Sequence, residues 1–463
     1  MQPRGGAGVE QSDTIVACAT PWGRAAIGVV RLSGSGVAQV LGEVCPRRAG
    51  MPPARRAVLV QLRDSGGIFD EGLLSWMPGP GSYTGEDSAE ISCHGNPLLV
   101  ERLLAACVAA GCRVALPGEF TRRAHSHGRL DLIRAEAVLQ AIEARSPGGL
   151  ELASRALRGE LGGWLEAQRQ ELLAIGAELE ARLDFPDQLE LLLDGSPGLQ
   201  DDDLLVARIL RAQGVLAAAA ATHRRARVQV QGARVALLGP VNAGKSSLFN
   251  ALLGRRRALV SAQPGTTRDV LEASVELCGL PVLLMDTAGE NLAPEELERA
   301  GIELRDELLA EVDLLVVVLP AHQLARREVA ALAARTRAHP RVLVGNHADR
   351  DGACFSLGGL PLIPTCALDG QGLDALRGAI AQALVGEEPG ESAAVIASQR
   401  QHELLLAASQ RLEQARLALV GEAGVAVAAE ELLAALTRLG EVSGGGVRDE
   451  VLDALFERFC IGK

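Results

Sequence analysis

The chain is short of lysine. Only two of its 46 basic residues are lysine, Lys245 and Lys463. Because all the other residues in this count are arginine, a retained lysine indicates a place where the wide, planar guanidinium does not fit. Lys245 stands inside GPVNAGKS, residues 239–246, where that reason can be tested. Lys463 is the last residue printed, and no local motif explains it.

Other features are also missing. The nine cysteines form no CxxC pair and match no histidine spacing, which argues against a disulfide framework and against a zinc site. No apolar run approaches the ~18 residues that cross a bilayer, and residues 1–13 hold no hydrophobic targeting segment. We therefore expect a cytoplasmic protein without a membrane. The net charge of −12 argues against broad non-specific nucleic-acid binding but leaves room for a local basic patch.

Residues 239–246 match the phosphate-loop pattern GxxxxGK[ST]. In that pattern backbone N–H groups surround the phosphates, and a slim lysine reaches the β- and γ-phosphates. The preceding residues 234–239 read as a buried strand and residues 246–254 as a helix, which is the context the motif requires. The predicted nucleotide contacts here are Asn242, Ala243, Gly244, Lys245, Ser246 and Ser247.

Further nucleotide motifs follow in the order that a doubly wound GTPase requires. SAQPGTTRD, residues 261–269, supplies a threonine hydroxyl, Thr267, that can complete a Mg²⁺ shell with Ser246. LPVLLMDTAG, residues 280–289, reads as a buried strand that ends in an aspartate for the same shell. The predicted GTP-binding residues in these and the next segments are Ser261, Gly265, Thr266, Thr267, Asp286, Thr287, Ala288, Gly289, Asn346, Asp349, Cys366 and Ala367.

The choice of base is encoded in RVLVGNHAD, residues 341–349, a strand that ends in an NxxD pattern. The Asp349 carboxylate can accept hydrogen bonds from N1 and the 2-amino group of guanine. Adenine offers no such donors, so it would leave a buried carboxylate unpaired. The ordered motifs therefore predict a GTPase.

The amino-acid composition and the spacing of apolar residues change along the chain and predict several domains. Short β-like runs broken by glycine and proline fill residues 1–127, the only part that is not acidic, and predict an α+β domain. Leucine and alanine at helical spacing fill residues 128–229 and 387–463 and predict one discontinuous all-helical domain. Residues 230–386 predict an inserted Ras-like, doubly wound α/β G domain. The expected fold class is multidomain α/β plus α.

Segments throughout the chain are similar to one family. They are ATPWGRAAIGVVRLSG (residues 19–34), PGPGSYTGEDSAEISCHGNP (78–97), PGEFTRRAHSHGRLDL (117–132), DFPD (184–187), GTTRD (265–269) and the terminal CIGK (460–463). Together they resemble the tRNA modification GTPases, MnmE/TrmE, over nearly the whole chain. The resemblance implies an N-terminal domain that binds folate and makes a homodimer.

The resemblance also implies an activity. Family members act with a flavin-dependent partner, MnmG/GidA, and add an aminomethyl or carboxymethylaminomethyl group to C5 of the wobble uridine of tRNA. The new carbon comes from 5-formyl- or methylene-tetrahydrofolate. Folate contacts are implied at Arg31, Glu90, Arg129 and Lys463, and a catalytic role is implied at Cys460.

In the G domain the resemblance implies a K⁺ ion that stabilises charge during phosphoryl transfer. Its ligands fall at Asn242, Ser261, Gln263 and Thr266. The water-orienting glutamate falls at Glu298, with Glu295 and Glu296 as close competitors. An exposed acid in the first turn of a helix would also explain Glu298.

The chain departs from the family pattern at several positions. His347 replaces the lysine of NKxD, so we expect weaker nucleotide binding with base choice preserved by Asp349. Cys366 replaces a serine, and Arg129 stands where lysine is common. Glu290 and Asn291 replace Leu-Arg, and a carboxylate at residue 290 could assist or repel the attacking water.

Two other functions stay open from the sequence. One is an RNA-binding assembly GTPase without one-carbon chemistry, and the other is a dimerisation switch that regulates other proteins. The basic stretch at residues 122–129 fits tRNA contact, a folate site or a solvated face. A folate site in the N-terminal third would favour the modification enzyme.

Overall fold

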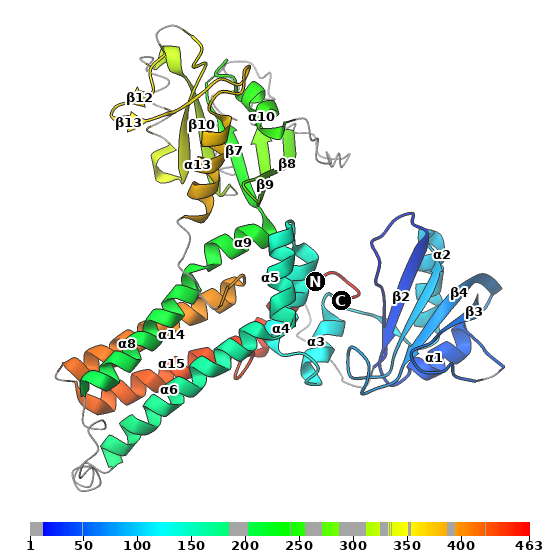
Figure 1. Cartoon of the computed structure of the whole chain (residues 1–463). Helices are drawn as coiled ribbons and strands as arrows, with labels where there is room; N and C mark the ends of the chain where they lie inside the picture. The colour runs from blue at the N-terminus through cyan, green and yellow to red at the C-terminus, as the bar shows by residue number, and fades with distance from the viewer. Residues whose placement is uncertain are drawn as a thin grey trace, which may run out of the picture. The chain divides into compact units, whose positions relative to one another are not determined.

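The computed structural model describes residues 13–48, 50–184, 202–240, 242–254, 271–286, 312–324, 332, 334, 336–350, 353–386, 394–421 and 423–463. The chain forms two compact units, Met1–Leu139 with Gly440–Lys463, and Gln140–Leu439 (Figure 1). The first unit joins the C-terminal segment to the N-terminal residues. The predicted domain boundaries, at residues 127, 229 and 386, stay a prediction.

The first unit is built on a six-stranded sheet in the order β3-β4-β5-β2-β1-β6. All neighbouring strands are antiparallel except β1 and β6. The strands are β1 Ile15–Cys18, β2 Ile27–Ser33, β3 Ala57–Asp64, β4 Gly67–Met77, β5 Ser88–His94 and β6 Arg113–Val114.

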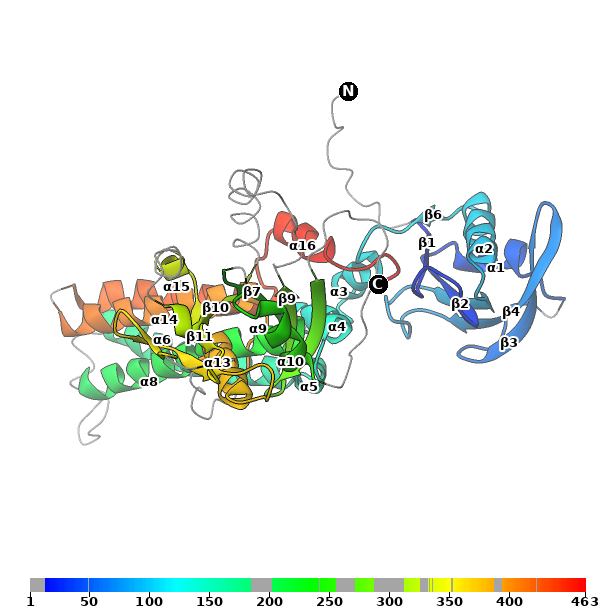
Figure 2. The ribbon, with the colours of Figure 1, turned by 90° about the horizontal axis from the view of Figure 1, so that it is seen from above.

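Two helices pack on this sheet, α1 Val37–Val44 and α2 Pro97–Ala109. They lie together on one side of it (Figure 2). Apolar side chains of both helices, including Leu41 and Leu103, join strand residues such as Val30 and Leu32 in one buried core. Burial of this aliphatic surface holds the layers together.

The C-terminal segment belongs to the same unit because it packs on helix α3, Glu119–Ser126. A last helix, α16 Asp449–Phe456, comes so close to α3 that a side chain at Gly118, which has φ 65°, would collide with the backbone of Phe456. Phe456 and Phe459 are buried with Leu132 of α4, Leu132–Glu143. Aromatic burial therefore fixes the tail.

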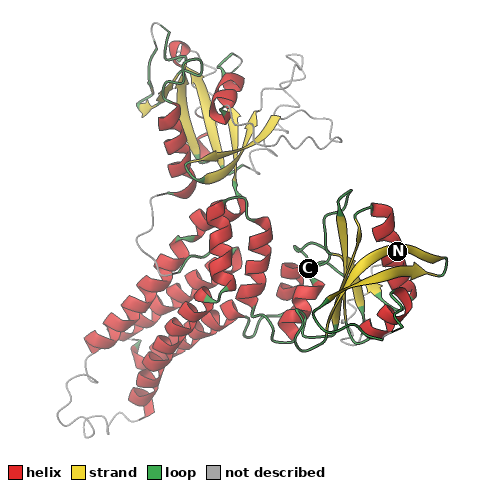
Figure 3. Cartoon of the chain, turned by 45° about the vertical axis from the view of Figure 1, so that its right-hand side comes forward, coloured by secondary structure: helices red, strands yellow, loops and turns green. Residues whose placement is uncertain are grey.

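The second unit contains a helical bundle and an inserted α/β layer (Figure 3). The described helices of the bundle are α5 Pro147–Leu157, α6 Glu160–Asp184, α8 Asp202–Ala221, α9 His223–Gln231, α14 Gln399–Val420 and α15 Gly424–Ser443. Residues 203–231 are long and apolar enough to cross a membrane by length and composition alone. In the structure α8 packs along α14, with Ile209 and Leu412 both fully buried.

The inserted layer has a six-stranded sheet in the order β14-β11-β10-β7-β9-β8. Only β8 runs antiparallel to its neighbour. The strands are β7 Ala233–Leu238, β8 Leu271–Leu277, β9 Leu280–Asp286, β10 Leu314–Pro320, β11 Arg341–Asn346 and β14 Ile363–Thr365. A small hairpin joins β12 Ser356–Leu357 to β13 Leu360–Pro361.

Helices α10 Lys245–Leu253 and α13 Leu373–Val385 pack against the aliphatic core of this sheet. Every residue of the central strand β10 is buried, as expected for a parallel strand covered on both faces. Short 3₁₀ turns cover Ala321–Gln323 (η1) and Thr336–Ala338 (η2). The predicted fold class is confirmed: the chain contains an α+β part, a helical part and a doubly wound α/β part.

Candidate functional site

The phosphate loop joins β7 to α10, as its sequence predicts. Gly244 has φ 85°, and a side chain there would collide with Asn346, so only glycine fits. Lys245 begins α10 and donates from Nζ to the carbonyl oxygens of Gly239 at 2.9 Å and Pro240 at 3.1 Å. The ammonium therefore lies inside the loop predicted to surround the phosphates.

The NxxD motif meets this loop at the carboxyl ends of neighbouring strands. Asn346, fully buried at the end of β11, donates from Nδ2 to the carbonyl of Ala243 at 2.8 Å. Thr365 at the end of β14 donates to Asn346 Oδ1 at 3.4 Å and accepts from the Ala348 N–H at 3.0 Å. The structure thus brings three predicted segments to one edge, where open α/β sheets bind ligands.

The remaining predicted nucleotide residues fall into two groups. In the described part, Asn242 has φ 60°, Ser246 and Ser247 are exposed, and Asp286 is buried at the end of β9. Asp349 is exposed, Cys366 is buried after β14, and Ala367 is half-buried beside it. Predicted residues that lie outside the described residues are Ser261, Gln263, Gly265, Thr266, Thr267, Thr287, Ala288, Gly289 and Glu298.

A second site lies in the first unit, where a cavity of about 250 Å³ is lined by Arg31, Met77, Tyr83, Thr84, Ser88, Glu90, Phe120, Val138 and Lys463. Arg31 and Glu90 are direct partners across β2 and β5. Arg31 donates from Nε and a terminal nitrogen to Glu90 Oε1 at 3.0 and 2.8 Å. The cavity thus carries an ordered guanidinium and carboxylate for a polar ligand.

The terminal residues complete this cavity. Arg31 donates to the Gly462 carbonyl, and Phe120 N–H donates to a carbonyl oxygen of Lys463, each at 3.1 Å. Gly462 has φ 98°, and a side chain there would collide with the backbone of Cys18. The structure therefore brings Arg31, Glu90 and Lys463 together around one cavity.

Two residues predicted for this site lie away from its walls. Arg129 is exposed and lies against Gly85, where an added Cβ would be 3.4 Å from Arg129 Cγ. Cys460 is also exposed. Neither belongs to the described residues that line the cavity, and their folate and catalytic roles stay predictions.

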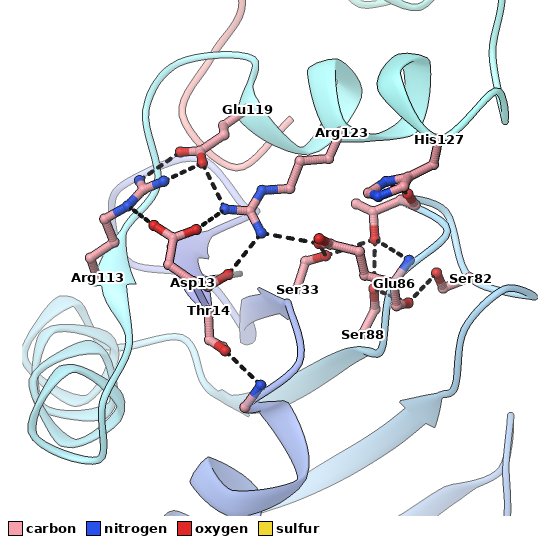
Figure 4. Close-up of polar contacts among 12 residues, drawn as sticks. Asp13, Thr14, Ser33, Ser82, Glu86, Ser88, Arg113, Glu119, Arg123 and His127 are labelled. Carbon is pink, nitrogen blue, oxygen red and sulfur yellow. Dashed lines mark hydrogen bonds and ion pairs between the residues drawn. The ribbon is translucent and has the colours of Figure 1, made fainter. Parts of the chain in front are cut away.

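A buried ionic network stands beside the cavity, and the sequence pattern did not identify it (Figure 4). Arg123, with 7% of its side chain exposed, pairs with Asp13 at 2.5 Å, Glu86 at 3.0 Å and Glu119 at 3.0 Å. Arg113 pairs with Asp13 and, at 2.5 Å, with Glu119. The local signals are the i,i+4 spacing of Glu119 and Arg123 and the six-residue spacing of Arg113 and Glu119. The contacts to Asp13 and Glu86 link distant segments.

The network is held in its charged state. Burial raises the pKa of Asp13 and Glu119, but hydrogen bonds from Arg113 and Arg123 outweigh it and leave both pKa values below their ordinary range. Arg123 does not point to a nucleic acid here, because its guanidinium is buried among carboxylates. This removes one residue from the basic stretch considered for tRNA contact.

Hydroxyl groups connect this network to the cavity wall. Ser33 donates to Glu86 Oε2 at 2.8 Å and lies 2.7 Å from the Thr84 hydroxyl. Thr84 is 3.1 Å from the Ser88 hydroxyl, and Thr84 and Ser88 both line the cavity. Arg123 therefore supports the cavity through Glu86 and Ser33 (Figure 4).

Comparison with known proteins gives matches over almost the whole chain. Residues 14–129 match the family model "GTP-binding protein TrmE N-terminus", and residues 132–460 match "MnmE helical domain". Three similar relatives each carry the name "tRNA modification GTPase MnmE". The protein of Myxococcus xanthus is 41% identical, over 98% of this chain and 99% of its own. The protein of Synechococcus sp. (strain JA-2-3B'a(2-13)) is 38% identical, over 98% of this chain and 98% of its own. The protein of Akkermansia muciniphila is 39% identical, over 97% of this chain and 99% of its own.

Proposed function

The chain belongs to the MnmE/TrmE family of tRNA modification GTPases, and on that premise we propose that it hydrolyses GTP during the modification of tRNA. The observation that carries the proposal is the junction of the phosphate loop and the NxxD motif through Asn346 and Ala243. The junction supports the proposal because it joins the segments predicted to bind phosphate and base at the edge where open α/β sheets bind ligands. Lys245 would bind the β- and γ-phosphates, and Asp349 would select guanine.

Two cations belong to this proposal. Mg²⁺ prefers oxygen ligands, and the exposed Ser246 hydroxyl at the start of α10 would hold it together with Thr267. K⁺ would be held by Asn242, Ser261, Gln263 and Thr266, of which Asn242 lies in the described part with its backbone at φ 60°. When bound, the cations neutralise charge that develops on the phosphates. Glu298 would orient the attacking water.

The cavity in the first unit supports the finer proposal that the tRNA substrate is modified with a folate one-carbon unit. A folate carries a carboxylate that a guanidinium can bind, and a pterin whose N–H groups suit a carboxylate. Arg31 and Glu90 supply those groups, and Lys463 adds a cation at the wall. A tetrahydrofolate derivative, 5-formyl or methylene, would bind here and deliver the carbon. Arg129 would also contact the folate, and Cys460 would take part in catalysis, as the resemblance implies.

The proposed product is a wobble uridine with an aminomethyl or carboxymethylaminomethyl group at C5. The proposed assembly is a cytoplasmic homodimer that works with the flavin-dependent MnmG/GidA partner and tRNA. The competing proposal, an assembly GTPase without one-carbon chemistry, has no use for the Arg31–Glu90 cavity. A dimerisation switch has none either.

The deciding measurement is mass spectrometry of wobble uridines from cells that lack the gene for this chain. We expect the C5 group to be absent and to return with the wild-type gene. Genes for Lys245→Ala and Arg31→Gln should each fail to restore it, while Arg102→Gln, which breaks an exposed ion pair with Asp64, should restore it. Normal uridine modification in the deletion cells would reject the modification enzyme and favour the assembly GTPase.

A further inference from the structure

The imidazole of His347 lies against the phosphate loop. His347 follows the buried Asn346 and has φ 63°, in the left-handed region that few non-glycine residues adopt. A Cβ placed on Gly244 would be 3.2 Å from His347 Nε2. The Asn346 amide thus bonds to the loop, and the His347 ring lies beside Gly244.

A second imidazole, which belongs to no nucleotide motif, stands behind the first. His322 lies in η1, directly after β10, and its ring centroid is 5.5 Å from that of His347 with the planes tilted by 52°. This spacing falls in the range of favourable tilted aromatic pairs. His322 therefore supports the side of the His347 ring from a neighbouring strand.

Two neighbouring side chains contact His322. Its Nε2 lies 3.3 Å from a terminal nitrogen of Arg350 and 2.9 Å from Gln323 Nε2. A guanidinium has only donors, so His322 Nε2 accepts. Arg350 and Gln323 therefore hold the His322 ring in place beside His347.

The charges around His347 favour its neutral form. Burial, then Arg350 and His322, lower the pKa of His347, and the Asp349 carboxylate only partly opposes them. The nearby cation of the phosphate loop, Lys245, is directed to the carbonyl oxygens of Gly239 and Pro240. Nδ1 of His347 is buried and, among the described residues, has no hydrogen-bond partner to stabilise a charged ring.

We propose that His322 is a positioning residue of the guanine-nucleotide site, which with Arg350 fixes an uncharged His347 imidazole against the phosphate loop. The inference rests on the proposed GTPase function and concerns residues that the nucleotide motifs do not contain. A neutral ring contributes packing to the loop and adds no charge beside the phosphates. Lys245 then supplies the cation of this loop alone.

The first test compares His322→Ala with His339→Ala in the full-length chain. His339 precedes β11, at the opposite end of the strand from Asn346, and serves as the matched control. Removing the supporting ring should weaken mant-GDP and mant-GTP binding by about fivefold, while kcat at saturating GTP changes less than about twofold. His339→Ala should leave both values unchanged.

The second test uses pH, which a loss of packing alone would not change. For each variant, the dissociation constant of mant-GDP is measured at pH 8.0 and at pH 6.0, and the ratio of the two values is taken. The same ratio is measured after His347→Asn is added to that variant. Dividing the first ratio by the second gives a corrected ratio, from which the titration of the nucleotide itself has been removed. The corrected ratio should be close to one for the wild type. Arg350→Gln removes a cation that opposes protonation, so His347⁺ should tighten binding at pH 6.0 by about threefold.

Two further variants sharpen this result. Arg350→Lys keeps the charge and a donor, so its corrected ratio should return toward one, and Arg337→Gln, on an exposed arginine elsewhere in the domain, should behave as wild type. Unchanged affinity in His322→Ala, or the same corrected ratio in Arg350→Gln and wild type, would overturn the inference. A wild-type chain that binds no guanine nucleotide would instead reject the proposed function.

Discussion

The two candidate sites are held in place by opposite means. Beside the cavity of the first unit, helix α3 is attached to the sheet by two guanidiniums and three carboxylates, of which Arg123 and Glu119 are buried. The nucleotide edge stands on an aliphatic sheet whose central strand β10 is buried throughout. There, backbone carbonyls and one buried amide, Asn346, position the functional groups.

The difference predicts how each site fails. Buried charges are stable only while each has its partner, so loss of one leaves an uncompensated charge. An aliphatic sheet responds to cavities and hardly at all to pH. We therefore expect the first site to be sensitive to charge and acid, and the second to lose function without losing stability.

Lys245 gives the largest expected effect. Lys245→Ala should lower GTP turnover by at least about a thousandfold, because the predicted G domain, residues 230–386, contains no other lysine. Thermal unfolding should hardly change, since the ammonium is half-buried and donates to carbonyl oxygens of its own loop, those of Gly239 and Pro240. Steady-state phosphate release measures the GTP turnover, and calorimetry measures the thermal unfolding.

Lys245→Arg is the sharper variant. If it kept more than about a tenth of wild-type turnover, a difference of ~1.4 kcal/mol in the barrier, the argument from lysine scarcity would be wrong.

Arg123→Met tests the charged side of the comparison. It should lower the free energy of unfolding of the first unit by about 3–5 kcal/mol, because three carboxylates lose a buried partner. Hydrogen exchange read by mass spectrometry should show the loss in residues 13–139, with mant-GDP affinity unchanged. The matched variant Arg102→Met, at an exposed pair with Asp64, should cost less than about 1 kcal/mol. Equal effects of the two would mean that burial does not decide the strength of the network.

Deleting Cys460 to Lys463 should separate the two sites. The deletion removes the Lys463 wall of the cavity and the Gly462 carbonyl that accepts from Arg31, so uridine modification should be lost. Basal GTP hydrolysis should stay within about threefold, or ~0.65 kcal/mol. Cells that carry only the shortened chain and still modify wobble uridine would show that the tail is dispensable.

The cation requirement sharpens the nucleotide side. Turnover should be about tenfold faster in K⁺ than in Na⁺ at equal ionic strength, because an oxygen cage sized for the larger ion stabilises the transition state. Asn242→Ala should remove the difference, and Asn250→Ala, on an exposed face of α10, should keep it. Equal rates of the wild type in both salts would exclude a K⁺ role.

Acid should act on the first unit before the second. Asp13 and Glu119 have pKa values lowered by Arg113 and Arg123 despite burial, so their contribution is complete above the unfolded values of about 4. It is lost as pH falls through the lower folded values. Hydrogen exchange between pH 5 and 3 should show residues 13–139 opening first, and Arg123→Met should remove this order.

The sequence alone determined the fold class, and it predicted which segments meet at the edge of the second sheet. The GxxxxGKS and NxxD motifs each predict the backbone conformation of a few residues. The alternation of strands and helices predicts that both motifs follow strands of one sheet. The resemblance to a family added the predicted folate contacts at Arg31, Glu90 and Lys463, and the comparisons then showed the family over nearly the whole chain.

Only the tertiary structure decided which distant residues meet. It set Arg31 against Gly462, 431 positions away, buried Arg123 among carboxylates, and placed His322 behind His347. It also left Arg129 exposed beside Gly85. Local spacing carries no record of such contacts, because they arise when separate elements pack and a side chain's partner is whichever group that packing brings within reach.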